Sequence, residues 1–332
     1  MKRVAYSLVV AASLVSTTAF AADMAVKAPP APAPAPSPWD VAITAALMSD
    51  YNFRGVTQSD HRPSTQAGFE PRYNFNANLQ GYVGVSGESI DFPNRAAAEI
   101  DFYGGIRPTF GKLALDFGDW YYYYPGGECF NVPPAGSAGC TVPGPAGNIS
   151  TLLPNGNAAK GNVSFDEFYA KATYTVNDSL SLGIQEWYSP SVENSGADGW
   201  YTVGNVTLTA PSTWFKDGLG AYVSGDAGYW ALGTTDSFYG IPGTIYAGGV
   251  PYTSYWNWDA GLGFTWKVFT LDLRYYDTDL TKAECNVFTS DQTAKFSLSN
   301  VTATNPGGLG SDWCGATFIA KLSAAINLSG LK

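Results

Sequence analysis

Alternation of apolar and polar residues runs along most of the chain and is clearest in residues 255–276. Nearly every second residue from Trp256 to Trp266 is apolar, and after a two-residue break the alternation resumes at Phe269. A period of two indicates a β-strand with one apolar face. If Trp266 pairs with Phe269, the apolar residues of both strands share that face. The stretch therefore predicts an amphipathic β-hairpin.

The two faces of this hairpin predict different surroundings. Aromatic residues stand at both ends of the apolar face, and the distance from Trp256 to Trp266, at ~3.3 Å per residue and a tilt near 40°, is roughly 25 Å, the height of the apolar band on an outer-membrane barrel. The opposite face carries Asp259, Asp272 and Arg274, which could not stay unpaired in a dry core. We therefore expect lipid on one face and a wet interior on the other. A hairpin of a soluble β-sandwich is the alternative that this stretch alone leaves open.

The same alternation recurs about twelve times from residue 39 onward. It is least regular in residues 201–210, where Gly204 and Asn205 blur it. The pattern predicts an all-β fold, a transmembrane antiparallel up-and-down β-barrel of twelve strands, with ten or fourteen as alternatives. The outward positions include Val41, Ile43, Leu47, Phe69, Tyr73, Val83, Val85, Ile100, Phe102, Ile106, Leu113, Leu115, Phe117, Phe168, Tyr174, Leu180, Leu182, Ile184, Leu219, Val223, Phe318, Leu322 and Ile326.

The lengths of the connections support a barrel independently of hydrophobicity. Short and long connections alternate strictly, as expected when periplasmic turns lie at one rim and extracellular loops at the other. A soluble sandwich has no reason to sort its loops in this way. The short set is 75–78, 108–111, 177–178, 211–217 and 267–268, and the long set is 49–64, 87–95, 125–162, 189–198, 231–253 and 278–313.

The N-terminal region predicts export. Lys2 and Arg3 precede an apolar run that ends in Ala19-Phe20-Ala21, which is typical of a secretory signal peptide over residues 1–21. Residues 22–38 include APPAPAPAPSP, a polyproline II tether that we expect in the periplasm. The tether is either an inert spacer or a contact with the cell wall. One barrel domain is expected over residues 39–332.

Composition narrows the class further. The chain has 10 Trp, 21 Tyr, 18 Phe and 37 Gly, with 14% charged residues and a mean hydropathy of −0.07. Past the signal peptide no run of 18 apolar residues occurs, which excludes a helical membrane span. A membrane barrel needs no such run, because its strands alternate apolar and polar residues. Without Lys2 and Arg3, the net charge changes from −10 to −12.

Cysteine and histidine usage excludes several kinds of chemistry. Cys129 and Cys140 share one long loop, and Cys285 and Cys314 bracket another, so two local disulfides are expected in an oxidising compartment. No C-x-x-C motif occurs and His61 is the only histidine, so we expect no metal and no cofactor. A hydrolase is also disfavoured, because no G-x-S-x-G motif occurs and His61 lies in a predicted external loop.

Five motifs follow one another between residues 49 and 190. They are Ser49-Asp50-Tyr51-Asn52-Phe53-Arg54-Gly55 with Gln58-Ser59 and Pro63, Glu99-Ile100-Asp101 with Gly104-Gly105, Tyr122-Tyr123-Tyr124-Pro125-Gly126, Asp166-Glu167-Phe168-Tyr169 and Tyr188-Ser189-Pro190. Their order and spacing are similar to those of the TorF-family porins of bacterial outer membranes, and the similarity extends over about residues 41–191. The resemblance implies an outer-membrane barrel with a pore, and it implies no particular substrate. The chain departs from the family in its cysteine-bearing loops, its proline tether and its ending at Lys332 without a terminal aromatic residue.

The inward positions predict a charged lumen. Eight acids and five bases leave an excess of three negative charges, which favours a weak preference for cations. The alternative is that these residues pair across strands and fill a closed barrel. They are Glu70, Arg72, Glu99, Asp101, Arg107, Asp116, Glu167, Lys171, Asp226, Asp259, Asp272, Arg274 and Lys321.

These observations together predict a porin-like channel for small hydrophilic solutes or ions in the bacterial outer membrane, with lipid around it and no nucleic-acid partner. A non-conducting structural barrel or surface receptor with a plugged lumen is the alternative. Asp50 and Arg54 are expected to brace the first loop against the barrel mouth, with gating as the alternative role. The loop aromatics are expected to form a membrane girdle and to pack the loops, with sugar stacking as the alternative; they are Tyr239, Tyr246, Tyr252, Tyr255 and Trp256.

Overall fold

The computed structural model describes residues 38–129 and 157–328. The predicted signal peptide, most of the proline-rich tether, Cys140 and the C-terminal ending lie outside the described residues. The predictions made for them stay predictions.

Twelve antiparallel strands close into a barrel, as the alternation predicts, and β1 joins the ends of the sheet by pairing with both β4 and β16. Each of the other strands pairs with its neighbours along the chain, so the topology is up-and-down. The strands are β1 (Trp39–Met48), β4 (Ser64–Asn76), β5 (Leu79–Glu88), β6 (Glu99–Phe110), β7 (Leu113–Tyr123), β8 (Phe165–Thr175), β9 (Leu180–Ser189), β10 (Gly199–Thr209), β11 (Leu219–Leu232), β12 (Tyr255–Trp266), β13 (Phe269–Thr278) and β16 (Thr317–Asn327).

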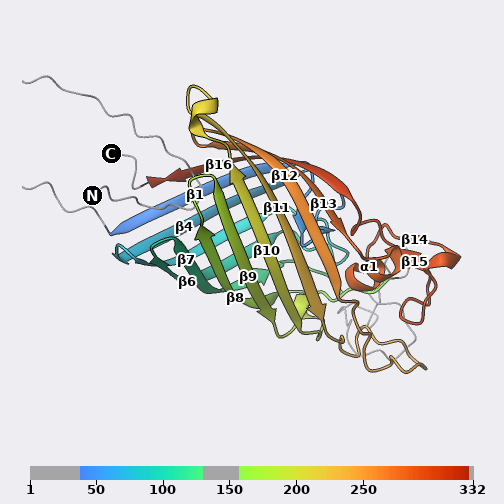
Figure 1. Cartoon of the computed structure of the whole chain (residues 1–332). Coiled ribbons are helices and arrows are strands. Elements are labelled where there is room, and N and C mark those ends of the chain that lie inside the picture. Colours follow the sequence, from blue (N-terminus) through green and yellow to red (C-terminus); the bar gives the residue numbers. More distant parts are fainter. Residues whose placement is uncertain (1–37, 130–156, 329–332) are drawn as a thin grey trace, which may run out of the picture.

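Long and short connections are sorted to opposite ends of the barrel, which we call the loop end and the turn end. Figure 1 shows α1, β14 and β15 at the loop end, opposite the start of β1 and the end of β16. Within the described residues, no helix is long and apolar enough to cross a membrane. The connections contain β2 (Asn52–Phe53), β3 (Val56–Thr57), η1 (Val192–Asn194), η2 (Ser212–Trp214), α1 (Lys282–Thr289), β14 (Lys295–Phe296), η3 (Leu298–Asn300) and β15 (Leu309–Gly310).

The outer face of the barrel is apolar. Trp266 pairs with Phe269 in the predicted register, so Leu262 lies opposite Leu273 and Phe264 opposite Leu271. The irregular strand β10 also follows the rule, because its Trp200, Val206 and Leu208 are exposed while Tyr201 and Val203 are buried. Exposed large apolar side chains on each strand form one band around the barrel, for example Leu47, Phe69, Val83, Phe102, Phe117, Phe168, Ile184, Leu208, Val223, Leu262, Leu271 and Phe318.

Most buried apolar residues gather in clusters at the loop end, although a few, such as Tyr82 and Tyr169, are buried further along the barrel wall. The largest cluster joins Val56 of the first loop to Trp230, Tyr255, Phe288 and Trp313. Helix α1 reaches this cluster through Phe288, and its first turn is fixed by a capping box between Thr281 and Glu284. The predicted disulfide between Cys285 and Cys314 is confirmed. The loops and the barrel mouth therefore form one packed unit.

Candidate functional site

The first long loop, residues 49–63, folds into the barrel mouth, and we call it loop 1. Its strands β2 and β3 pair through Asn52 with Thr57 and through Phe53 with Val56, which leaves Arg54 and Gly55 as a two-residue turn. Both turn residues have positive φ, 51° and 85°, as a tight hairpin turn requires. Gly55 is also needed for space, since a Cβ there would lie 2.2 Å from Thr278 Cγ2. The tip of loop 1 therefore presents Arg54 to the lumen.

Arg54 is fixed by a two-pronged ion pair. Its Nη1 and Nη2 donate to Oε1 and Oε2 of Glu167 on β8, at 2.8 and 2.7 Å, and the two side chains are 5% and 1% exposed. Such a planar pair is stronger and more directional than a single contact. Tyr122 adds a hydrogen bond to Glu167 Oε2 at 3.1 Å, and Tyr255 donates to the Arg54 carbonyl oxygen at 3.1 Å.

Aromatic rings surround the guanidinium of Arg54. Its Cζ lies 4.2 Å from the Tyr201 ring centroid, 4.3 Å from that of Trp230 and 4.6 Å from that of Phe53. Cations above such rings gain electrostatic attraction, most of all where water is excluded. Loop 1 is thus held at the mouth by β8, β10, β11 and β12, as predicted for Arg54.

Tyr51 connects the other side of loop 1 to β6. Its hydroxyl donates to Glu99 Oε1 at 2.5 Å, and Tyr124 donates to Glu99 Oε2 at 2.8 Å. Asp50, expected to brace the loop against the barrel mouth, instead accepts hydrogen bonds from Thr57 Oγ1 and Ser59 Oγ, at 2.5 and 2.9 Å, inside loop 1. Asp50 therefore holds the loop in shape, and Tyr51 and Arg54 hold it against the wall.

His61 joins loop 1 to the last long loop, residues 279–316, which we call loop 6. Its Nδ1 lies 2.9 Å from Asp50 Oδ2 and its Nε2 lies 3.1 Å from the carbonyl oxygen of Asp312. Both neighbours are acceptors, so both ring nitrogens can donate only when the imidazole is protonated. The hydrogen bond to Asp50 accordingly raises the pKa of His61, against the smaller opposing effect of burial.

Below loop 1, one charged network lines the wall formed by β4 to β7. Arg107 donates from Nη1 and Nη2 to Glu70 at 2.7 and 3.1 Å, and from Nε to Asp116 at 3.1 Å. Arg72 Nε donates to Glu70 at 2.5 Å, and Tyr82 donates to Asp116 at 2.5 Å. The charges on this wall are therefore largely paired with one another.

A second network lines the opposite wall formed by β11 to β13. Arg274 pairs with Asp259 and, through Nε at 3.0 Å, with Asp272. Tyr222 donates to Asp272 at 2.7 Å. Asp226 lies directly across the β11–β12 ladder from Asp259. This side of the lumen has more acids than bases.

The two lysines of the predicted lumen set contact aromatic rings or an amide group, whereas the arginines form ion pairs. Lys171 Nζ lies 4.2 Å from the Tyr169 ring centroid and 4.3 Å from that of Trp187, and Lys321 Nζ donates to Gln66 at 3.0 Å. None of the thirteen predicted lumen residues is exposed on the outer face. That they line a conducting pore stays a prediction.

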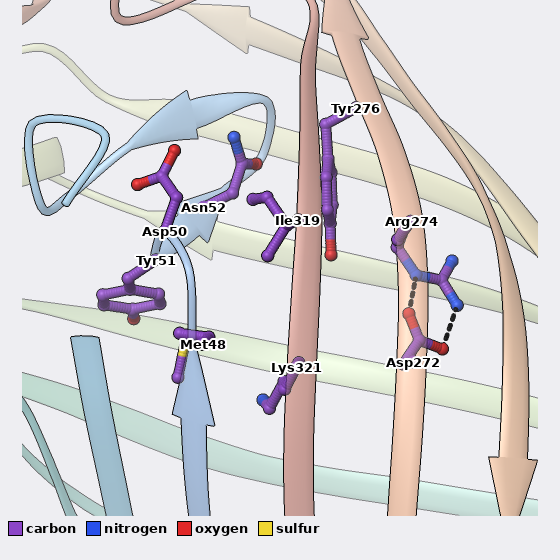
Figure 2. A pocket seen from close by; sticks show the side chains of 9 residues that line it. All are labelled: Met48, Asp50, Tyr51, Asn52, Asp272, Arg274, Tyr276, Ile319 and Lys321. Carbon is purple, nitrogen blue, oxygen red and sulfur yellow. Dashed lines mark hydrogen bonds and ion pairs between the residues drawn. The ribbon is translucent and has the colours of Figure 1, made fainter. Parts of the chain in front are cut away.

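A cavity of about 80 Å³ remains between loop 1 and the wall formed by β13 and β16. Figure 2 shows Tyr51 and Asn52 on the loop side, facing the side where Tyr276 and Ile319 lie. Asp272, Arg274 and Lys321 contribute charged groups to its lining. A polar cavity of this size holds several water molecules, so loop 1 narrows the mouth but leaves a polar gap on this side.

The structure also bears on the roles predicted for the loop aromatics and for the cysteines. Tyr252 and Tyr255 are buried in the loop-end cluster, while Trp256 packs at a tilt against Tyr229 on the outer face, which favours packing and girdle roles. The pairing of Cys129 with Cys140 stays a prediction, because Cys140 is not described.

The set of lumen residues predicted from the sequence did not include Glu88. The alternation set by Val83 and Val85 on the same strand would have placed this residue inward.

Comparisons with known proteins relate only part of the chain to a described family. A family model described as a bacterial protein of unknown function, Gcw_chp, matches residues 32–141, about a third of the chain. No curated protein matches. The TorF resemblance is therefore not confirmed at the level of the family.

Similar solved structures are outer-membrane proteins. The NanC porin is 8% identical, with 86% of this chain and 98% of that chain covered and a TM-score of 0.40. OmpT of Vibrio cholerae, in a form lacking its loop L8, is 12% identical, with 87% and 98% covered and a TM-score of 0.35. These scores are too low to carry an argument about function.

Proposed function

We propose that the protein is a porin-like barrel of the bacterial outer membrane that conducts small hydrophilic solutes or ions past loop 1. The apolar outer band supports a lipid environment, because large exposed side chains such as Leu262 and Phe102 would otherwise face water. The polar and charged inner wall supports a wet lumen, since these groups would be costly in a dry core.

The observation that carries the proposal is the position of loop 1 across this lumen. Its tip reaches Glu167 on β8, while a polar cavity stays open beside Asp272 and Lys321. A loop that narrows the mouth and leaves a polar gap beside it is compatible with a channel of restricted passage.

We further propose a weak preference for cations. The predicted lumen set has eight acids and five bases, and adding Glu88 and Arg54 leaves the excess at three negative charges. Because most of these charges are paired, as Glu70 is with Arg107, the excess sets a weak bias and not a strong filter.

The alternative is a non-conducting barrel whose mouth is closed. The specific observation in its favour is the burial of the Arg54–Glu167 pair, at 5% and 1% exposure. The two functions differ in one measurable property, which is current through the isolated protein.

Planar-bilayer recording of the purified full chain separates them. We expect small current steps from the wild type and larger steps from Arg54→Ala, because that variant loses the contact that holds loop 1 in the mouth. Arg62→Ala is the matched control, since Arg62 is exposed and pairs with Asp60 and Asp91 on the outside of the loop; its steps should equal those of the wild type. Absence of current from both the wild type and Arg54→Ala would exclude the channel and leave the closed barrel.

A further inference from the structure

Three carboxylates meet on the inner wall where β5 ends and β6 begins. Glu88 lies opposite Glu99 in the ladder, and Asp101 is two residues further along the same face of β6. One oxygen from each carboxylate lies within 4.8 Å of the other two. All three residues are buried, with exposed fractions of 2 to 3%. The register of two strands has therefore brought three acids together away from solvent.

The hydrogen bonds around this trio leave two oxygens open. Both oxygens of Glu99 are taken by tyrosine hydroxyls. Glu88 Oε1 accepts from Gln66 at 2.8 Å, and Asp101 Oδ2 accepts from Ser86 at 3.1 Å. The remaining oxygens, Glu88 Oε2 and Asp101 Oδ1, are buried without a hydrogen-bond partner. A buried oxygen in this state costs free energy that a bound ligand would recover.

The trio is poorly compensated by positive charge, because Lys321 attracts Glu88 electrostatically but forms no ion pair with it. Among residues 38–129 and 157–328, no lysine, arginine or histidine forms an ion pair with any of the three acids. The ammonium of Lys321 instead contacts Gln66, the residue that donates to Glu88. Three carboxylates this close together can all be ionised only when a cation compensates them; otherwise at least one of them holds a proton.

We propose that Glu88, Glu99 and Asp101 bind one Ca²⁺ ion. Calcium–oxygen distances of 2.3–2.6 Å place opposing ligand oxygens about 4.6–5.2 Å apart, which agrees with the spread of this trio. The ligands are all oxygens, which excludes the nitrogen and sulfur chemistry that zinc prefers. Mg²⁺ keeps several waters and demands stricter geometry, so it suits a site this buried less well.

A cation here would also act on loop 1. Glu99 is the acceptor for Tyr51 of that loop, so a cation that fixes the Glu99 carboxylate fixes the acceptor of this hydrogen bond too. Tyr51 is therefore a positioning residue for the site. The inference does not depend on whether the barrel conducts, because binding is measured without current.

Calorimetric titration of the full chain in detergent, after treatment with EDTA, tests the proposal. We expect the wild type to bind one Ca²⁺ saturably, to unfold at a higher temperature in Ca²⁺ than in EDTA, and to bind Mg²⁺ more weakly. Asp101→Asn and Glu88→Gln should weaken Ca²⁺ binding by about tenfold or more, since ligand contacts are at least as important as the groups behind them. Asp226→Asn, which removes a lumen carboxylate on β11, should bind Ca²⁺ as the wild type does.

Two results would overturn the site. Failure of the wild type to bind Ca²⁺ saturably at millimolar concentration would mean that protons compensate the trio. Unchanged affinity in both ligand variants would place the binding elsewhere. If those variants do not fold, Tyr51→Phe leaves all three carboxylates in place; a severalfold weaker Ca²⁺ affinity in it supports the site, and an unchanged affinity contradicts it.

Discussion

Arg54 holds the tip of loop 1 against the barrel wall. It adopts a positive φ of 51°, which costs a residue with a side chain on the order of 1–2 kcal/mol. The cost is offset by two charge-assisted hydrogen bonds to Glu167 and by the rings of Phe53, Tyr201 and Trp230. A strained residue held by many contacts is typical of a functional position.

Replacing Arg54 with methionine should release loop 1. The change leaves Glu167 buried and uncompensated, which costs about 3–5 kcal/mol. We expect hydrogen exchange of the loop 1 amides to accelerate by roughly a hundredfold or more. Adding Glu167→Gln should recover part of the protection, while Arg62→Met should leave it unchanged. Unaltered exchange in Arg54→Met would show that the ion pair does not hold the loop.

At the scale of elements, loop 1 and loop 6 cover the mouth together. Thr57 donates its backbone N–H to the carbonyl oxygen of Trp313 at 3.0 Å, and the Trp313 indole donates to Asp60 at 2.9 Å. The disulfide between Cys285 and Cys314 closes a separation of 29 residues within loop 6. Loop 1 therefore rests against a loop that is itself cross-linked, and His61 is a titratable contact between the two loops.

The His61 link predicts a pH dependence. Because the pKa of His61 is raised in the folded state, its stabilising effect is fully present below about pH 6.5 and is lost as the pH rises through the raised pKa. The side chain is 38% exposed, so solvent screening keeps the effect small. We expect the unfolding temperature of the wild type to exceed that of His61→Gln at pH 5.5 to 6 and the two to converge at high pH. A difference that does not vary with pH would contradict this link.

The whole molecule is a barrel whose apolar side chains face outward and whose charged side chains face inward, the reverse of a soluble protein. Leu262 is 40% exposed on the outside, while Asp259, on the same strand, is mostly buried and paired with Arg274 inside. Closure through β1 and β16 leaves no free edge, so all twelve strands have two neighbours, as a membrane span requires. In water this outer face would be a large exposed apolar patch.

A charge placed on the outer band should oppose insertion. Leu262→Arg near the middle of the band is expected to cost about 2–4 kcal/mol of folding free energy in a bilayer. Leu262→Ala is the control and should fold nearly as the wild type does. Folding into lipid vesicles across a urea series, followed by gel mobility, measures the difference. If both variants fold equally well, Leu262 does not face lipid.

The sequence by itself determined the barrel. Strand side chains alternate strictly, so the order of Phe269, Leu271 and Leu273 against Asp272 and Arg274 already assigns the two faces, and the alternating connection lengths assign the two ends. The alternation predicted twelve strands, with ten or fourteen left open, and it predicted the pairing of Trp266 with Phe269; the structure confirms both. These features depend on neighbours in the chain, which a sequence states directly.

Only the tertiary structure decided what occupies the mouth. Arg54 and Glu167 are 113 residues apart in the chain, and no period in the sequence relates them. Glu88 and Glu99 meet because a loop brings β5 and β6 into one register, and a search of the sequence for histidine and cysteine ligands does not find such a trio. The physical reason is that barrel closure sets which distant side chains share the lumen, and side-chain alternation along a single strand carries no information about that choice.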